Sequence, residues 1–241
     1  MKLITTSWDD GNIADLRLAE LLDKYNLAGT FYIPAANKEH SVMSEKDIVE
    51  LSGGFEIGGH TINHVKVDKT SFRLFDAEIK GCYEWLTNLL GQPPISFCFP
   101  VGAYNKSAID YTLSTGFKII RTTELLNPWL DAYDPIVPTT LQVYPHSAFT
   151  YYKHLIKRLK YKSLKLYIKS NNTSDLIQLV DFYLNNPDLE EGCFHLWGHS
   201  WEIEENNLWS KLEEIFKILS NISGVSYVNN GDLRNFKKHK S

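Results

Sequence analysis

The first 33 residues, MKLITTSWDDGNIADLRLAELLDKYNLAGTFYI, have the pattern of one β-α-β unit. The apolar segment Leu3–Trp8 predicts a strand, the amphipathic spacing across Ile13–Tyr25 predicts a helix, and Ala28–Ile33 predicts a second strand. Two strands joined by a crossover helix are the building unit of a parallel sheet. The opening segment therefore predicts an α/β fold.

The same alternation continues along the rest of the chain. Six further strands are predicted, at Phe55–Gly58, Ile95–Phe99, Phe117–Arg121, Thr140–Tyr144, Gly192–Trp197 and Val225–Val228. Helices are predicted at Ser44–Leu51, Thr70–Leu90, Lys106–Thr115 and Leu208–Leu219, and two more helical segments precede Gly192. The loop Thr122–Pro138 has neither pattern and is expected to be irregular. About eight strands with crossover helices are typical of a parallel sheet or barrel, and no linker, composition shift or repeat divides the chain into domains.

The composition is that of an ordinary globular protein. The chain has 241 residues, of which 43% are hydrophobic and 22% are charged, and this excludes disordered, collagen-like and membrane-spanning classes. The net charge of −4 predicts no nucleic-acid partner. Basic residues are enriched in Lys153–Lys169 and in the Lys237–Lys240 tail, where we expect solvated helix faces and a frayed terminus.

Cysteine content and the first residues predict the compartment. The three cysteines, Cys82, Cys98 and Cys193, are too few and odd in number for a disulfide framework. A short apolar stretch before Asp9 does not reach the length of a secretory leader, and no window is apolar enough for a membrane span. A cytoplasmic protein is therefore expected.

Polar clusters follow several of the predicted strands. In a barrel of parallel strands, functional residues lie on the loops after the carboxyl ends of the strands. The clusters that obey this rule are Asp9-Asp10 after the first strand, His60 and His64 after the third, Pro100–Tyr104 after the fourth and His199 after the seventh. Their placement predicts one convergent site.

The first cluster, Ser7-Trp8-Asp9-Asp10-Gly11, places two adjacent carboxylates at a strand end. Successive side chains diverge there, so one carboxylate can bind a metal while its neighbour accepts a proton. The alternative is structural, because Asp-Asp-Gly is also a common turn.

The second cluster, His60-Thr61-Ile62-Asn63-His64, spaces two imidazoles at i and i+4. This separation lays both on one face of a helical turn, where they can chelate one divalent ion. With Asp10 the set leaves open positions for water and substrate, as a hydrolytic metal centre requires. The alternative is two unrelated polar residues at a helix start.

Two later segments offer further candidates. Phe97–Asn105 predicts a buried strand that ends in a turn, where Tyr104 is a candidate for a substrate groove. In the segment from Phe194 to Glu202, His195 and His199 share one face of an alternating strand. A histidine beside a metal-bound oxygen can protonate a leaving amine, and we assign that role to His199. His195 lies deeper in the strand and is expected to be a core histidine.

Together and in this order, the four segments resemble the polysaccharide deacetylase family, which includes chitin and peptidoglycan N-deacetylases, from about Leu3 to Leu233. The segment at 7–11 resembles the family's Thr-Phe-Asp-Asp-Gly motif, and the segment at 60–64 is similar to its His-Ser/Thr-x-x-His motif. The resemblance implies a single domain over residues 1–241, folded as a distorted (β/α) barrel of seven or eight mostly parallel strands. It also implies that Asp9 is the catalytic base and that the metal ligands are Asp10, His60 and His64.

The remaining motifs of the family match this chain less closely. Cys98 stands where many members carry an arginine that orients the base. His199–Ile203 is similar to one variant of the final motif, which implies that His199 is the general acid; Phe194-His195 is similar to the commoner form, and His195 is the alternative acid. Asn127–Asp131 is the nearest match to a motif that supplies an acid to tether this histidine and a groove tryptophan. The substrate-binding residues that the resemblance implies are Pro100, Tyr104, Trp129, His195 and Trp201.

The function implied is a metal-dependent hydrolase that removes an N-acetyl group from a saccharide and releases acetate and an amine. The divalent metal is expected to be zinc, with cobalt and nickel as alternatives. Trp129, Tyr133 and Trp201 offer rings for sugar stacking, and a cytoplasmic enzyme would act on a nucleotide-linked or lipid-linked saccharide. Three alternatives remain open: an amidohydrolase acting on a small or cyclic amide, a catalytically inactive saccharide-binding homologue, and a metal-stabilised scaffold that binds a protein.

Overall fold

A computed structural model describes residues 2–67, 70–131 and 135–237 of the chain. Tyr133 and the side chains of the Lys237–Lys240 tail lie outside the described residues. Within the described residues, one sheet of nine strands runs through the molecule in the order β6-β5-β4-β3-β2-β1-β8-β7, with β9 beside β1. The strands are β1 (Leu3–Asp9), β2 (Thr30–Ile33), β3 (Glu56–Gly59), β4 (Ser96–Cys98), β5 (Ile119–Arg121), β6 (Ile136–Val137), β7 (Leu141–Gln142), β8 (Cys193–Gly198) and β9 (Ser226–Tyr227).

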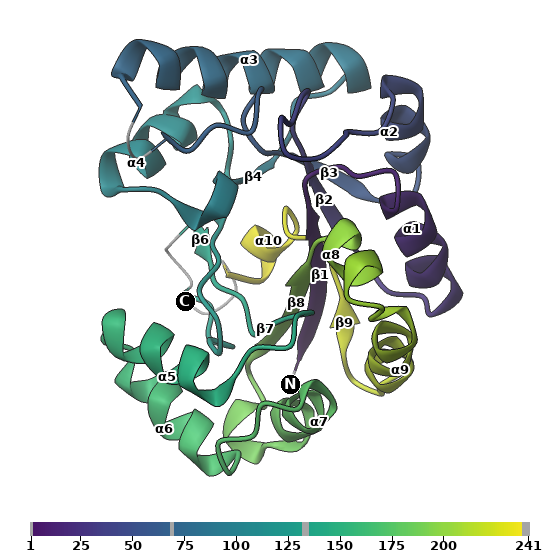
Figure 1. Ribbon diagram of the computed structural model, residues 1–241, viewed down its shortest axis with the longest axis vertical. Coiled ribbons are helices and arrows are strands. Elements are labelled where there is room, and N and C mark those ends of the chain that lie inside the picture. The colour runs from purple at the N-terminus through teal and green to yellow at the C-terminus, as the bar shows by residue number, and fades with distance from the viewer. Residues whose placement is uncertain (1, 68–69, 132–134, 238–241) are drawn as a thin grey trace.

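All paired strands are parallel, and the sheet curls into an incomplete barrel (Figure 1). The predicted α/β fold, a distorted barrel of mostly parallel strands, is therefore confirmed. One strand was not expected, because β6 lies in the loop predicted to be irregular. It has two residues between Pro135 and Pro138, too few to show any alternation.

Ten helices are described, and most of them lie outside the sheet (Figure 1). They are α1 (Asp15–Lys24), α2 (Glu45–Leu51), α3 (Phe72–Leu90), α4 (Lys106–Thr115), α5 (Ala148–Lys157), α6 (Tyr161–Lys169), α7 (Leu176–Asn185), α8 (Ser200–Glu205), α9 (Trp209–Leu219) and α10 (Leu233–Lys237). Three helices precede β8 where two were predicted. Helical structure is interrupted between α5 and α6 at Leu159, whose φ of +53° is incompatible with a continuous helix. No described helix has both the length and the apolar composition to cross a membrane.

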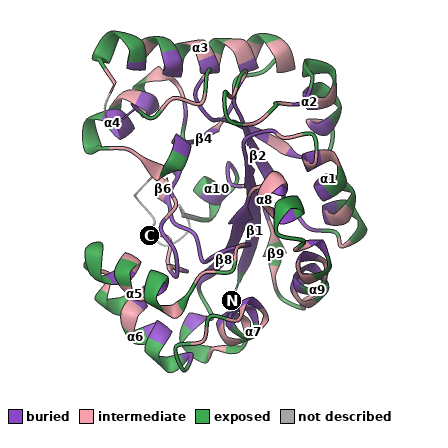
Figure 2. Ribbon diagram, viewed as in Figure 1, coloured by how far each residue is buried: buried purple, intermediate pink, exposed green. Residues whose placement is uncertain are grey.

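The core surrounds β1, in which every residue is buried (Figure 2). Trp8 of β1 packs edge-on against Phe216 of α9, with 6.1 Å between the ring centroids. Side-chain caps fix where several helices begin: Ser44, Ser71 and Asn105 each accept a hydrogen bond from the backbone three residues later. This buried layer holds the strand ends in place.

The parallel register brings the carboxyl ends of the strands to one edge. Asp9 is the last residue of β1 and pairs with Tyr32 of β2, while Cys98 of β4 pairs with Arg121 at the end of β5. Gly198 ends β8 beside Trp8. The loops that leave this edge carry the polar clusters predicted to converge.

Candidate metal and catalytic site

The turn after β1 separates the two adjacent aspartates. Asp9 keeps strand geometry, whereas Asp10 has a φ of +81°, a conformation that non-glycine residues rarely adopt. Gly11 follows with a φ of +63°, and a Cβ there would lie 2.6 Å from the Ile33 side chain. The two carboxylates consequently leave the strand end in different directions. Strained backbone of this kind is concentrated at functional sites.

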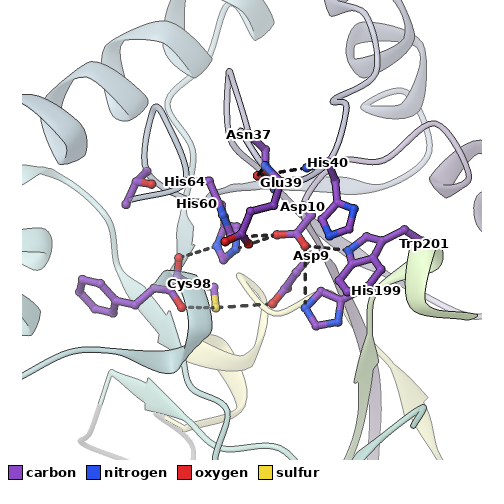
Figure 3. Close-up of polar contacts among 12 residues, drawn as sticks. Asp9, Asp10, Asn37, Glu39, His40, His60, His64, Cys98, His199 and Trp201 are labelled. Atoms are coloured by element: carbon purple, nitrogen blue, oxygen red, sulfur yellow. Dashed lines mark hydrogen bonds and ion pairs between the residues drawn. The ribbon is translucent and has the colours of Figure 1, made fainter. Parts of the chain in front are cut away.

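Asp10, His60 and His64 bring together three atoms that could hold a metal ion (Figure 3). Oδ1 of Asp10 lies 3.0 Å from Nε2 of His64 and 3.4 Å from Nε2 of His60, and the three atoms lie within 4.8 Å of one another. Nδ1 of His60 donates a hydrogen bond to the Cys98 carbonyl at 2.8 Å, so Nε2 is the ring nitrogen that faces Asp10. One carboxylate oxygen and two imidazole nitrogens form a donor set that fits Zn²⁺ or a similar divalent ion.

The route by which the two imidazoles meet differs from the one predicted. They do not lie on a helical turn: His60 follows β3 directly, and the chain then bends through positive φ values at Thr61 and His64. Glu78 of α3 holds this bend, because its carboxylate accepts hydrogen bonds from the backbone and the side chain of Asn63. The i, i+4 helix argument was wrong, although the ring centroids do come within 5.1 Å.

The second oxygen of Asp10 is held from another segment. Nε1 of Trp201 donates a hydrogen bond to Oδ2 of Asp10 at 2.8 Å, and the Trp201 ring stacks on His40 with 3.9 Å between centroids. Burial alone would raise the pKa of Asp10, but the adjacent His60 and His64 lower it well below its usual range. Asp10 is therefore ionised, as a metal ligand must be.

Asp9 is paired with a buried arginine that the sequence analysis did not single out. Arg121, the last residue of β5, forms an ion pair with Oδ1 of Asp9, and both side chains are buried. The guanidinium carbon lies 5.0 Å from the Tyr32 ring centroid and 4.9 Å from that of Trp197, within cation–π range. Burial alone would lower the pKa of Arg121, but Asp9 raises it above its ordinary value.

Arg121 supplies the positive charge that was expected at position 98, where this chain has a cysteine. Cys98 and Arg121 are register partners on neighbouring strands, and Sγ of Cys98 lies 4.0 Å from Oδ2 of Asp9. Burial raises the pKa of Cys98 well above that of an ordinary thiol, so the side chain stays neutral. The charge that orients Asp9 therefore comes from the strand next to the expected one.

His199 faces the same centre from the end of β8. Its Nδ1 donates a hydrogen bond to Oε2 of Glu202 at 3.2 Å, and its Nε2 lies 4.0 Å from Oδ2 of Asp10. Burial alone would lower the pKa of His199, but Glu202, Asp9 and Asp10 raise it above its ordinary value. Gln142 steadies Glu202 by donating to the same Oε2 at 3.0 Å. His199 thus directs Nε2 toward the centre, in surroundings that favour the protonated ring.

His195 is placed away from that centre, in the core. Its Nδ1 donates to the Pro138 carbonyl at 3.0 Å, and its Nε2 accepts from the Ser7 hydroxyl at 2.8 Å. Burial lowers the pKa of His195 to about 3, so the ring is neutral. Both ring nitrogens are occupied by the protein itself.

A cavity of about 420 Å³ lies over the centre. Among the described residues, its lining includes Asp9, Asp10, His60, His64, His199 and Trp201. Of the predicted substrate-binding residues, Trp201 is in this lining. From the turn after β4 the lining includes Val101 but neither Pro100 nor Tyr104. The Tyr104 ring packs against Phe99, with 5.6 Å between centroids. Trp129 lies in a separate hollow, with Nζ of Lys162 3.8 Å from its ring centroid.

Several residues of the site were not predicted from sequence. Arg121 ends an otherwise apolar strand, and a charge in that position is a detectable signal of a buried ion pair. Glu202 lies three residues after His199, the spacing at which side chains meet on a helix, and it occupies the place for which Asn127–Asp131 was the nearest candidate. His154 and Arg158 reach the cavity from α5 and its end and had no motif to mark them.

Comparison with known proteins shows what the chain is similar to. Residues 1–120 match the sequence family described as polysaccharide deacetylase. A curated relative from Bacillus subtilis, "Putative polysaccharide deacetylase YxkH", is 25% identical over 128 residues, which are 51% of this chain. The match spans 45% of that relative's own length.

Two solved structures share the fold over nearly the whole chain. The chitin deacetylase of the fungal pathogen Colletotrichum lindemuthianum has a TM-score of 0.60 and 16% identity, covering 95% of this chain and 86% of that one. A family 4 acetyl xylan esterase from Clostridium thermocellum, solved with a cobalt ion, has a TM-score of 0.59 and 17% identity, covering 98% and 91%. The sequence match places residues 1–120 of this chain in the polysaccharide deacetylase family, and the solved structures share the fold over nearly the whole chain.

Proposed function

We propose that the protein, as one catalytic domain, is a divalent-metal-dependent hydrolase that removes the acetyl group from an N-acetylated saccharide. The observation that carries this proposal is the convergence of Asp10, His60 and His64 beside Asp9, a second carboxylate with its own counter-ion, Arg121. A metal-ligand set, a separate base and a cavity above them are the parts that hydrolysis of an acyl group requires.

The metal ligands would hold the ion at the floor of the cavity. A divalent ion bound there would act as a Lewis acid, which lowers the pKa of a bound water and polarises an acetyl carbonyl. Asp9 is in the cavity lining and accepts the proton of the attacking water. Its ion pair with Arg121 fixes the orientation of the carboxylate.

His199 completes the reaction at the leaving group. When the water oxygen has bonded to the acetyl carbon, the carbon–nitrogen bond breaks and the nitrogen needs a proton. Nε2 of His199 delivers that proton, while Glu202 holds the ring through Nδ1. The products are a free amine and acetic acid, which ionises to acetate. Asp9 then releases its proton to solvent, and His199 takes a proton up from solvent.

The proton donor, His199, favours an N-acetyl over an O-acetyl substrate. An amine is a poorer leaving group than an alcohol unless it is protonated, and the raised pKa of His199 suits that task. The similar structures include both a chitin deacetylase and an acetyl xylan esterase, so both ester and amide substrates need to be compared. A small or cyclic amide is the second candidate, because the same chemistry would cleave it.

Zinc is the proposed metal, since one oxygen and two nitrogen ligands suit it; cobalt and nickel accept the same donors. The compartment proposed is the cytoplasm. It is supported by Cys82, Cys98 and Cys193, which are all buried free thiols.

Acetate release after metal removal tests the proposal. The protein is stripped with a chelator, reloaded with zinc, cobalt or nickel, and incubated with N-acetylglucosamine oligomers, acetylated xylan and a cyclic amide. We expect metal-dependent acetate release from the oligomers, and loss of both metal and activity in His60→Ala. Release by the metal-free protein would contradict the proposal. Saccharide binding without release would identify an inactive homologue, and loss of thermal stability alone would identify a scaffold.

A further inference from the structure

The α5–α6 hairpin has a charge unlike that of the rest of the chain. Residues 149–169 contain seven Lys or Arg and no Asp or Glu, although the chain as a whole has a net charge of −4. The two helices lie side by side at one edge of the molecule, at the lower left of Figure 1. The mechanism proposed above does not use their outer surface.

The same hairpin exposes large apolar side chains, which a solvated basic face does not require. Five of the eleven exposed large hydrophobic residues in the described part of the chain lie within these 21 positions. They are Phe149 (75% exposed), Leu159 (67%), Tyr161 (66%), Ile156 (60%) and Ile168 (52%). Figure 2 shows that much of the surface of α5 and α6 is exposed. The solvated basic face expected over Lys153–Lys169 therefore also carries exposed apolar side chains.

Each helix of the hairpin places apolar and basic residues on one stripe. On α5 the stripe is Phe149, Lys153 and Ile156, at i, i+4 and i+7, and these positions share one face of a helix. On α6, residues of the same three kinds recur at the same spacing, as Tyr161, Lys165 and Ile168. An aromatic ring, a lysine and an isoleucine are thus repeated in both helices.

The opposite faces of the helices are already occupied. Tyr151 and Leu155 of α5 are buried, and Tyr167 of α6 packs against Tyr151 with 5.4 Å between ring centroids. In the described structure, Lys153 and Lys165 form no ion pair, and neither does Lys157 beside the α5 stripe. The stripes are therefore free to contact a partner, and their cations are not neutralised within the chain.

We propose that the α5–α6 face is a docking surface for a membrane that contains anionic phospholipids. Lysines beside exposed aromatic and aliphatic side chains on a helix are the combination that binds such a surface: the cations attract the headgroups, and the apolar side chains enter the boundary below them. A nucleic acid or other polyanion would use the cations but leave the isoleucines without a partner. A second copy of this face would oppose its lysines to lysines.

Docking in this way places the catalytic cavity near the membrane. Thr150 and His154 of α5, and Arg158 at its end, line the cavity over the metal ligands, while the stripe of the same helix faces outward. A saccharide carried on a lipid could then reach the centre without leaving the membrane. Only this consequence for the substrate rests on the proposed function; the docking surface itself does not.

Sedimentation with vesicles tests the surface without any activity assay. The 241-residue protein is mixed with vesicles of equal parts phosphatidylglycerol and phosphatidylcholine, or of phosphatidylcholine alone. We expect binding to the anionic vesicles only. The triple variant Lys153→Gln, Lys157→Gln, Lys165→Gln should bind roughly 100-fold more weakly, because each lysine contributes separately to attraction by an anionic surface. The matched control, Lys46→Gln, Lys106→Gln, Lys118→Gln, changes three exposed lysines on other elements and should bind like the unaltered protein.

A second variant separates membrane docking from other uses of the charge. Phe149→Ser with Ile156→Ser keeps every cation and should weaken vesicle binding about tenfold, because the apolar side chains no longer insert. Circular dichroism verifies that each variant is folded. The proposal is overturned if the unaltered protein ignores anionic vesicles, if both triple variants bind alike, or if the apolar variant binds vesicles normally while heparin competes fully. It is also overturned if the unaltered protein is a dimer that the apolar variant dissociates.

Discussion

Arg121 at the end of β5 forms a buried ion pair with Asp9 at the end of β1, although three strands lie between β5 and β1 in the sheet. The contact is possible because the sheet curls, so that the ends of these two strands face each other across its interior. The pair supplies the orienting charge that Cys98 lacks. It also links Asp9 to the curl of the sheet.

Removing the arginine should therefore destabilise the fold as well as the site. Arg121→Met leaves the Asp9 carboxylate buried without a counter-ion, and we expect the free energy of unfolding to fall by about 3–5 kcal/mol, as measured by urea denaturation. The double variant Arg121→Met, Asp9→Asn removes both charges and should regain part of that loss. A single variant as stable as the unaltered protein would show that the pair contributes nothing to folding.

Asp9 and the metal ligands should respond differently to substitution. Asp9→Asn removes the proton acceptor but no ligand, so turnover should fall by about two to four orders of magnitude while the metal content is unchanged. Acetate release and elemental analysis measure the two quantities on protein shown to be folded. His60→Ala is the comparison, since it removes a ligand and should lose the metal. Near-native turnover in Asp9→Asn would assign the base elsewhere.

Glu202 should set the pH range in which the acid works. His199 must be protonated to act, so activity declines as pH rises through its pKa, which Glu202 helps to raise. Glu202→Gln removes that negative charge and should move the alkaline limb of the kcat profile to lower pH. Glu205→Gln, which alters an exposed acid on the same helix, should leave the limb in place. An unshifted limb in Glu202→Gln would separate His199 from the proton transfer.

His195 should make the fold sensitive to acid. Its pKa is about 3 in the folded protein and near 6.5 when unfolded, so protonation favours the unfolded state. The full contribution to stability is present above about pH 6.5 and is lost as pH falls toward 3. Between pH 6.5 and pH 5 the loss from this group is about 2 kcal/mol. Urea denaturation at both pH values should give a shallower dependence for His195→Gln; an equal dependence would exclude His195 as the source.

The sequence alone was sufficient to predict the architecture and the strand ends that carry the chemistry. Hydrophobic periodicity is local, so the unit from Leu3 to Ile33 and its repetition indicate a parallel sheet before any contact is known. Parallel strands end at one edge, which is why Asp10 and His60, 50 positions apart in the chain, could be expected to meet. That expectation depends on strand direction and not on side-chain detail.

The tertiary structure decided which side chains hold the predicted site residues in position. The partner of Asp9 depends on how far the sheet curls, a property that no local pattern encodes. His60 and His64 approach each other through a bend that Glu78 of α3 holds, and not through helical spacing. Which face of α5 and α6 stays exposed follows from tertiary packing, because Tyr151 and Tyr167 are buried against each other on the inner side. Local periodicity specifies elements, whereas long-range packing determines which side chains meet.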